Sequence, residues 1–244
     1  MTQAVKFDSV SFSYDSVTVL EDITFTVDEH DFIGIIGPNG GGKTTLLKLM
    51  LGLIKPMSGS VKIFDDIPLN QRRRIGYVPQ FINDDPQFPI RVRDVIAMGL
   101  LSSGKFGPWI GKEQRKRIDD AMASVNIADL VDAPFGELSG GQRQRCIIAR
   151  ALVSSPDILL LDEPTASVDS WIERDLFEML KNMSKSRTII FVTHDLGFIS
   201  TYVDKVACVN RHIAIHPVSE ITTDSIISDV YSSNTAMIKH RCGL

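Results

Sequence analysis

The chain has 244 residues, a formal net charge of −4, 43% hydrophobic and 23% charged residues, and three cysteines. This length gives one or two domains, and the composition excludes a disordered chain or a disulfide framework. The acidic charge excludes a protein that coats nucleic acid. No run approaches the roughly 18 apolar residues of a membrane span, so we expect a soluble chain that reaches any membrane through a partner. Because the cysteines are too few for a disulfide framework, we expect a reducing compartment.

The first 85 residues predict antiparallel strands followed by the start of a parallel α/β core. Apolar and polar residues alternate in the first thirty positions, which is typical of half-exposed antiparallel strands. The continuous apolar run 32–36 predicts a buried central strand, and apolar residues at helical spacing over 46–51 predict a helix that ends near Gly52. The strands expected in this part are 5–12, 23–27, 32–36, 61–64 and 75–78.

The rest of the chain predicts an inserted helical part and a return to the core. Apolar residues recur at helical spacing from 86 to about 154, and the core resumes with a strand at 158–161, a helix over 172–183 and a strand at 188–192. This alternation favours a mostly parallel sheet with right-handed crossovers. The expected organisation is a single domain, 1–244: an α/β core from 1–85 and 155–210 that includes the antiparallel part, a helical subdomain at 86–154, and a C-terminal extension at 211–244. The end of that extension, 224–244, is either a helix or partly loose.

A glycine-rich loop lies between the predicted strand 32–36 and the predicted helix. It fits G-x-x-x-x-G-K-[ST] and comprises Gly37, Pro38, Asn39, Gly40, Gly41, Gly42, Lys43 and Thr44. Glycines let consecutive N–H groups point at phosphate oxygens, and the helix N-terminus adds positive potential. We expect Lys43 to reach the β- and γ-phosphates of ATP, Thr44 to bind Mg²⁺, and Thr45 to bind the α-phosphate. The alternative, a turn that binds nothing, does not explain the strand and helix on either side.

Two carboxylates follow the predicted strand 158–161. Ligand groups of open α/β sheets gather at the carboxyl ends of strands. We therefore expect Asp162 to hold Mg²⁺ through its water shell, and Glu163 to polarise the attacking water as a general base. A pair of solvated loop acids is the alternative, which the phosphate loop upstream disfavours.

A second anion site is predicted where a serine and two glycines begin a helix. This motif consists of Leu138, Ser139, Gly140, Gly141 and Gln142. Its LSGGQ sequence, between a phosphate loop and the LLLDEP of 159–164, resembles the ABC transporter ATPase family, and the resemblance covers about 5–210. It implies an α/β fold with a P-loop core, an N-terminal antiparallel β subdomain and an inserted helical subdomain. It also implies a head-to-tail homodimer that sandwiches two ATP molecules, in which Ser139, Gly140 and Gly141 contact the γ-phosphate bound by the partner chain.

The same resemblance implies roles for four further residues. Tyr14 would stack on adenine, with a plain strand tyrosine as the alternative. Gln80 would reach Mg²⁺ and the attacking water, His194 would contact the γ-phosphate as a switch histidine, and Asp169 would lie in a loop that crosses the dimer interface. The chain departs from the family in Gly41 and in the Ala-Ser-Val-Asp loop at 166–169, but neither change removes a catalytic group, so we expect an active ATPase.

The run 88–99 resembles the corresponding stretch in ATPases of zinc, manganese and iron uptake systems, and a similar run occurs in siderophore and cobalamin importers. The resemblance therefore implies a subunit that powers an importer, most similar to the metal-cation type. Its partners would be transmembrane permease subunits and, indirectly, a substrate-binding protein. Its place would be the cytoplasmic face of the cell membrane.

Other readings remain as alternatives. A soluble ABC ATPase of translation or DNA repair usually has two ATPase units or a long coiled-coil insertion, which this chain lacks. A P-loop kinase or helicase leaves LSGGQ unexplained, and a non-hydrolysing module would be expected to lack Glu163 or His194. Cys208, His212 and His216 have a spacing that suggests a metal sensor, but we expect Cys208 to be buried in a strand and the histidines to lie in a turn.

Overall fold

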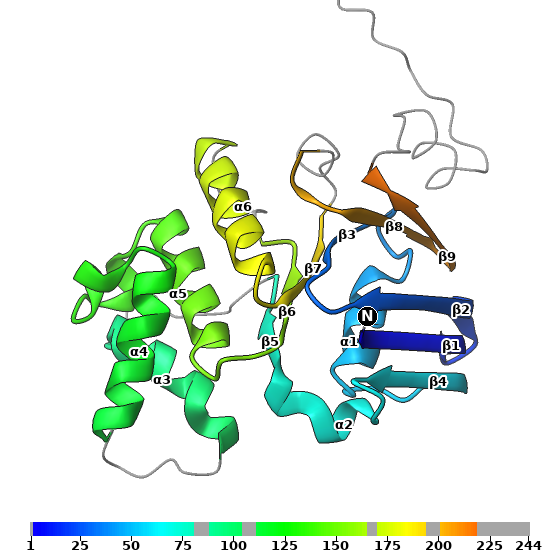
Figure 1. The fold of residues 1–244 in the computed structure, drawn as a ribbon, viewed down its shortest axis with the longest axis horizontal. Helices are drawn as coiled ribbons and strands as arrows, with labels where there is room; N and C mark the ends of the chain where they lie inside the picture. Colours follow the sequence, from blue (N-terminus) through cyan, green and yellow to red (C-terminus); the bar gives the residue numbers. More distant parts are fainter. Residues whose placement is uncertain (1, 81–87, 104–110, 165–169, 194–200, 219–244) are drawn as a thin grey trace, which may run out of the picture.

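The computed structural model describes residues 2–80, 88–103, 111–164, 170–193 and 201–218, without the side chains of 170–172. Its strands form two sheets (Figure 1), an antiparallel one in the order β2-β1-β4 and a six-stranded one in the order β5-β6-β7-β3-β8-β9. All neighbouring strands of the larger sheet are parallel except β8 and β9. The strands are β1 Gln3–Tyr14, β2 Val17–Asp28, β3 Phe32–Ile36, β4 Ser58–Ile63, β5 Ile75–Val78, β6 Ile158–Asp162, β7 Thr188–Val192, β8 Lys205–Asn210 and β9 His212–Pro217.

Six α-helices and four short 3₁₀ helices lie in the described part of the chain. The α-helices are α1 Lys43–Met50, α2 Pro68–Gln71, α3 Val92–Ala97, α4 Lys112–Ser124, α5 Gly140–Leu152 and α6 Ser170–Ser184. The 3₁₀ helices are Arg72–Arg74, Met98–Ser103, Ala128–Leu130 and Phe135–Glu137. Figure 1 shows α3, α4 and α5 gathered in a lobe at the opposite end of the molecule from the antiparallel sheet.

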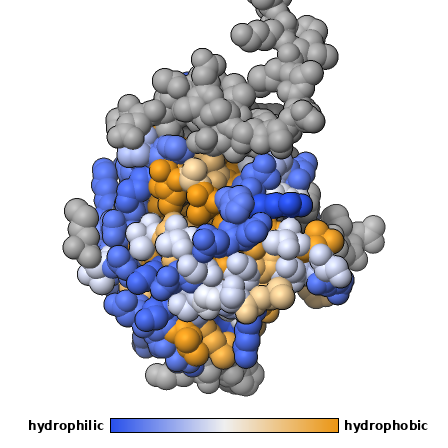
Figure 2. Space-filling view, turned by 90° about the vertical axis from the view of Figure 1, so that its right-hand side faces the viewer, coloured by the Kyte–Doolittle hydropathy of each residue, from blue (hydrophilic) through white to orange (hydrophobic). Residues whose placement is uncertain are grey.

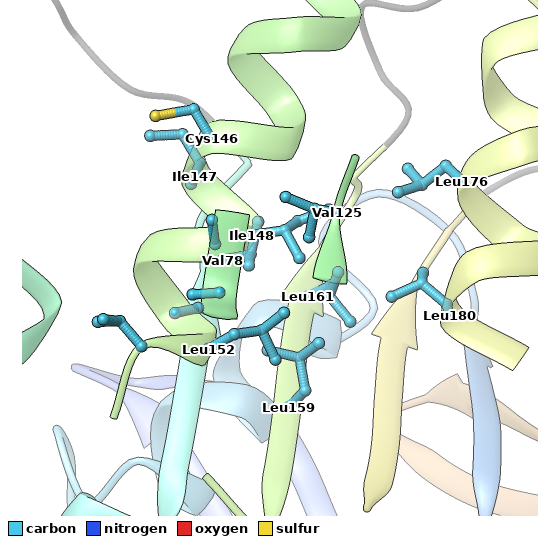
Figure 3. Packing of buried hydrophobic residues seen from close by; sticks show 14 of the residues in the cluster. Val78, Val125, Cys146, Ile147, Ile148, Leu152, Leu159, Leu161, Leu176 and Leu180 are labelled. Atoms are coloured by element: carbon cyan, nitrogen blue, oxygen red, sulfur yellow. The ribbon is translucent and has the colours of Figure 1, made fainter. Parts of the chain in front are cut away.

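The six-stranded sheet is buried on both faces, as a parallel sheet requires. Leu159 and Leu161 of β6 pack in one cluster with side chains of α5 and α6, among them Leu152 and Leu180 (Figure 3). Leu160, which lies between those two leucines, packs on the other face with α1 and the antiparallel sheet. This alternation explains why the strands read as continuous apolar runs in the sequence.

The fold class predicted from the sequence is confirmed, including the antiparallel sheet, the mostly parallel core and the helices inserted between β5 and β6. Three strands are longer than predicted or begin earlier: β1 and β2 each have 12 residues, and β4 begins at Ser58. The predicted end of the chain, 224–244, lies outside the described residues.

The larger sheet continues past residue 210, where the sequence predicted the core to end. Strand β9 pairs antiparallel with β8, and the register places Ala214 opposite Cys208. The prediction that His212 and His216 lie in a turn is wrong, because both belong to β9. Cys208 is buried, as expected. Within the described ranges, no three histidine, cysteine or acidic side chains are grouped so that they could hold a metal ion.

The surface around the free end of the antiparallel sheet is largely polar, with separate apolar areas between the polar side chains (Figure 2). No helix in the described part of the chain combines the length and the apolar character that crossing a membrane requires.

Candidate functional site

The loop 37–42 joins the end of β3 to the start of α1, and two of its glycines leave no room for a side chain. A Cβ on Gly37 would lie 2.0 Å from the carbonyl oxygen of Val209 in β8. Gly42 has a φ of +106°, which other residues rarely adopt, and a Cβ there would lie 2.6 Å from Leu20 in β2. The glycines therefore let the loop pass close to both strands.

The amine of Lys43, the first residue of α1, lies inside this loop. The residue is 6% exposed, and its Nζ donates to the carbonyl oxygens of Gly37 at 2.8 Å and Pro38 at 3.0 Å. Burial lowers the pKa of Lys43, an effect that the negative charges of Glu163 and Asp162 oppose. An ammonium group held at this position can make charge-assisted hydrogen bonds to phosphate oxygens, which are stronger than bonds to neutral carbonyls.

Asp162, the last residue of β6, is a buried carboxylate and only 3% exposed. The hydroxyl groups of Thr44 and Tyr77 are close enough to Asp162 to influence its electrostatics. Burial raises the pKa of Asp162, although the Thr44 hydrogen bond and the nearby Lys43 charge act in the opposite direction. Burial and the charge of Asp162 raise the pKa of Tyr77 to about 12, so the phenol keeps its proton at neutral pH.

Glu163 follows Asp162 and is held from two sides. Its N–H donates to the carbonyl oxygen of Val192 at the end of β7, at 3.1 Å. The Nε2 of Gln80, just after β5, donates to Glu163 Oε2 at 2.7 Å. The backbone φ of Glu163 is +48°, a left-handed value that is uncommon for a residue other than glycine. Such a conformation is retained only where the surroundings fix it, and these two hydrogen bonds do so here.

The phosphate loop, Lys43, Gln80 and Glu163 border a pocket of about 830 Å³. The residues that line it are Tyr14, Val19, Gly37, Pro38, Asn39, Gly40, Gly42, Lys43, Thr44, Thr45, Gln80 and Glu163. Tyr14 is 43% exposed, and its ring packs edge-on against Phe12 with 4.8 Å between the centroids. The pocket thus combines an aromatic platform, a glycine loop with a buried cation, and a group of acidic and amide side chains.

Two residues at this site were not identified from the sequence. Val19 lines the pocket from β2 and Tyr77 contacts Asp162 from β5. Neither belongs to a motif with a fixed spacing. Val19 reaches the site because β2 passes close to Gly42 of the phosphate loop, and Tyr77 because β5 pairs with β6.

The predicted motif Ser139–Gln142 does not line this pocket. It forms the N-terminus of α5, where Ser139 Oγ accepts from the Gln142 N–H at 3.3 Å and the Ser139 N–H donates to Gln142 Oε1 at 2.9 Å. Ser139 and Gly140 are exposed, whereas Gly141 is buried. The motif is therefore an ordered helix end, closed by a capping box, and its residues are not among those that line this chain's own pocket. Asp169 and His194 lie outside the described residues.

We expect Asp162→Asn to raise the unfolding temperature of the nucleotide-free protein at neutral pH. Folding raises the pKa of Asp162, so the folded protein holds this proton more tightly than the unfolded chain does. The contribution of Asp162 to the free energy of unfolding is therefore largest at acidic pH, and it falls as the pH rises from the ordinary aspartate pKa to the raised value of the folded state. An asparagine has no charge to bury. A gain of about 1 kcal/mol would shift the midpoint by roughly 2–4 °C.

Thermal unfolding followed at pH 7 and at acidic pH tests this expectation. The gain over the parent should shrink at acidic pH, where Asp162 is protonated. Asp129→Asn, at an exposed position, is the matched control and should have little effect. An Asp162→Asn protein that unfolds at a lower temperature at pH 7 would contradict the expectation.

The comparison with known proteins decides the family. The model of the ABC transporter family matches residues 20–166. A protein of Chlamydia pneumoniae described as a metal transport system ATP-binding protein is 39% identical over 240 residues, which cover 96% of this chain and 97% of that protein. The chain belongs to the ABC transporter family. It is an ATPase of that family, as the sequence predicted.

Two other ABC transporter relatives also match most of the chain. The zinc uptake system ATP-binding protein ZurA of Listeria innocua is 39% identical and covers 87% of this chain and 85% of its own. The manganese transport system ATP-binding protein MntB of Halalkalibacterium halodurans is 35% identical and covers 97% of this chain and 95% of its own.

Solved structures of ABC transporters share the fold. A chain from an inward-facing transporter described as metal-chelate type has a TM-score of 0.83 at 26% identity, and the match covers 94% of this chain and 89% of that one. A dimeric bacterial ABC transporter cassette has a TM-score of 0.76 at 27% identity, with 88% of this chain and 98% of that chain covered.

Proposed function

We propose that this ATPase powers an importer of divalent metal cations, namely zinc, manganese or iron. The observation that carries the proposal is the likeness over nearly the whole chain to ATP-binding proteins named for metal, zinc and manganese transport. The run 88–99, which resembles the same stretch in metal uptake ATPases, supports it. A siderophore- or cobalamin-type importer is the second candidate, favoured by the structural likeness to a transporter described as metal-chelate type.

In the proposed complex, ATP occupies the pocket of about 830 Å³. Adenine stacks on the exposed face of Tyr14. The phosphates lie in the loop formed by Gly37, Pro38, Asn39, Gly40, Gly41 and Gly42, with Lys43 on the β- and γ-phosphates and Thr45 on the α-phosphate. Lys43 is already buried there, and the low local dielectric strengthens the attraction of its ammonium group for phosphate.

The donor set beside the phosphate loop fits Mg²⁺. A carboxylate, a hydroxyl and an amide oxygen are the hard oxygen ligands that this ion takes, and Asp162, Thr44 and Gln80 supply them. When bound, Mg²⁺ would neutralise charge on the phosphates. Glu163 would accept the proton of the attacking water, with the Gln80 amide, 2.7 Å from its Oε2, fixing the carboxylate.

We further propose that the active unit is a head-to-tail homodimer. Ser139 and Gly140 at the start of α5 are exposed and do not line the pocket of their own chain, so the helix N-terminus is free to meet the γ-phosphate held by a second chain. Asp169 would cross the interface, and His194 would contact the γ-phosphate. The likeness to a dimeric cassette supports this arrangement.

The proposed partners are permease subunits, with a substrate-binding protein acting through them, and the proposed location is the cytoplasmic face of the cell membrane.

Uptake of radioactive zinc, manganese and iron by cells that lack the chain tests the proposal. The parental chain should restore uptake of one of these ions, and Glu163→Gln should not. Restored uptake of a ferric siderophore or cobalamin instead would favour the second candidate. A chain that does not copurify with a membrane protein and restores no uptake would contradict both.

A further inference from the structure

A small cavity lies at the opposite edge of the larger sheet from the phosphate loop. Arg187 comes directly before β7 and Ser155 shortly before β6, so the cavity is at the amino ends of these parallel strands, whereas the phosphate loop follows the carboxyl end of β3. Its volume is about 150 Å³, below the roughly 300–1,000 Å³ of pockets for drug-sized ligands, so it has room for a small ion and not for a nucleotide. The residues that line it are Arg117, Asp120, Ala121, Ser124, Leu152, Ser155 and Arg187.

Arg187 brings to this cavity a hydrogen-bond donor that is not used within the chain. Its Nε is buried and has no hydrogen-bond partner among the described residues. The charge of Asp157 acts on Arg187, but that carboxylate lies 2.6 Å from the Nε of Arg74. Buried donors are almost always hydrogen-bonded, so an unmatched one indicates a water molecule or an ion beside it.

A second guanidinium group favours an anion over water in this cavity. Arg117 of α4 is half-buried like Arg187, and its Nε donates to the carbonyl oxygen of Val153 at 3.1 Å, which uses one of its five donors. Asp120 also lines the cavity but is exposed, so the walls keep a net positive charge. Two guanidinium groups at one small cavity repel each other, and an anion between them removes that cost. The planar fork of arginine matches the oxygens of an oxyanion such as phosphate.

We propose that this cavity binds one small oxyanion of the size of inorganic phosphate, held by the guanidinium groups of Arg117 and Arg187. The site is separate from the proposed nucleotide site and does not depend on it. Arg117 belongs to the inserted helical part and Arg187 to the α/β core. The bound anion therefore joins these two parts, and it stabilises the folded chain because the unfolded chain has no such site.

Calorimetric titration with inorganic phosphate tests the proposal. ATP and EDTA are present throughout, so that the proposed nucleotide site is filled and no hydrolysis takes place. We expect the parental chain to bind one phosphate. Arg117→Gln and Arg187→Gln should each weaken this binding by about tenfold or more, because each removes a charge-assisted hydrogen bond.

Arg115→Gln is the matched control. Arg115 is an exposed arginine of the same helix and does not line the cavity, so phosphate affinity should stay unchanged. Thermal unfolding gives a second measurement. Phosphate at several times its Kd should raise the unfolding temperature of the parent and of Arg115→Gln by about 2–4 °C, and that of the two cavity variants far less. Each protein is compared with itself without phosphate, so a general loss of stability in a variant does not affect the result.

Three results would overturn the proposal. Phosphate affinity that is equal in the parent, Arg117→Gln and Arg187→Gln would place the anion elsewhere on the chain. A parental chain that binds no phosphate in the presence of ATP would mean that the cavity holds water. Binding that is lost in Lys43→Ala but kept in both cavity variants would assign the phosphate to the loop that we propose for ATP.

Discussion

Glu163→Gln should keep ATP binding and reduce turnover by about 10²–10⁴-fold, the usual contribution of a general base. The amide cannot accept a proton from water. It does keep the shape of the side chain and an oxygen that can accept the hydrogen bond from Gln80 Nε2, which is 2.7 Å long in the parent. The site should therefore remain assembled and lose only the proton-accepting step.

The variant should accumulate as an ATP-bound dimer, since closure of the proposed dimer no longer leads to hydrolysis. Gel filtration with ATP and Mg²⁺, together with a phosphate-release assay, measures both effects. Glu178→Gln, at an exposed position of α6, is the matched control and should behave like the parent. Hydrolysis by Glu163→Gln at the parental rate would mean that another group is the base.

Two inactive variants should regain activity when they are mixed. Lys43→Ala deletes the cation of the phosphate loop and should weaken ATP binding itself, because charge-assisted bonds to phosphate are the strong ones. Ser139→Arg should fill the space of the γ-phosphate at the start of α5 and be nearly inactive. In a mixed dimer both lesions fall in one site, while the other site combines an intact Lys43 with an intact Ser139.

The measurement is the ATPase rate against the mixing ratio, with the permease present if the isolated chain dimerises too weakly. The rate should be highest at an intermediate ratio, and coupling between the sites would keep it below half of the parental value. Ser139→Ala is the control, because it removes the cap at a cost of about 1 kcal/mol without filling the phosphate space. Normal hydrolysis by Ser139→Arg alone in the full assembly would disprove the head-to-tail arrangement.

Local patterns of the sequence were sufficient for the elements and the phosphate loop. The apolar runs that became β3, β6 and β7 are buried on both faces, which is why they could be recognised without their neighbours. The glycines of the loop were readable because they belong to a motif of fixed local spacing, although the neighbours that exclude a side chain, Val209 for Gly37 and Leu20 for Gly42, are distant in sequence.

The remaining features depend on partners that are distant in sequence. Tyr77 belongs to the site only through the pairing of β5 with β6. Strand β9 forms because β8 offers it an edge, and its own pattern is weak. The hydrogen bond between Gln80 and Glu163 spans 83 positions of the chain. The capping box was not predicted, although a serine followed three residues later by glutamine, here Ser139 and Gln142, is its sequence signature.

That capping box has a consequence for how two chains would meet. The end of α5 is already ordered in a single chain, so association need not also order this segment, which would cost about 0.5–1.5 kcal/mol for each immobilised side chain. What one folded chain lacks is the phosphate that its partner holds. In the proposed dimer, the attraction between the chains is therefore linked to occupancy by nucleotide, and the fraction of paired chains follows the free ATP concentration by mass action. The ATP concentration in the cell would then set how often the two chains of the proposed dimer associate, before ATP is hydrolysed.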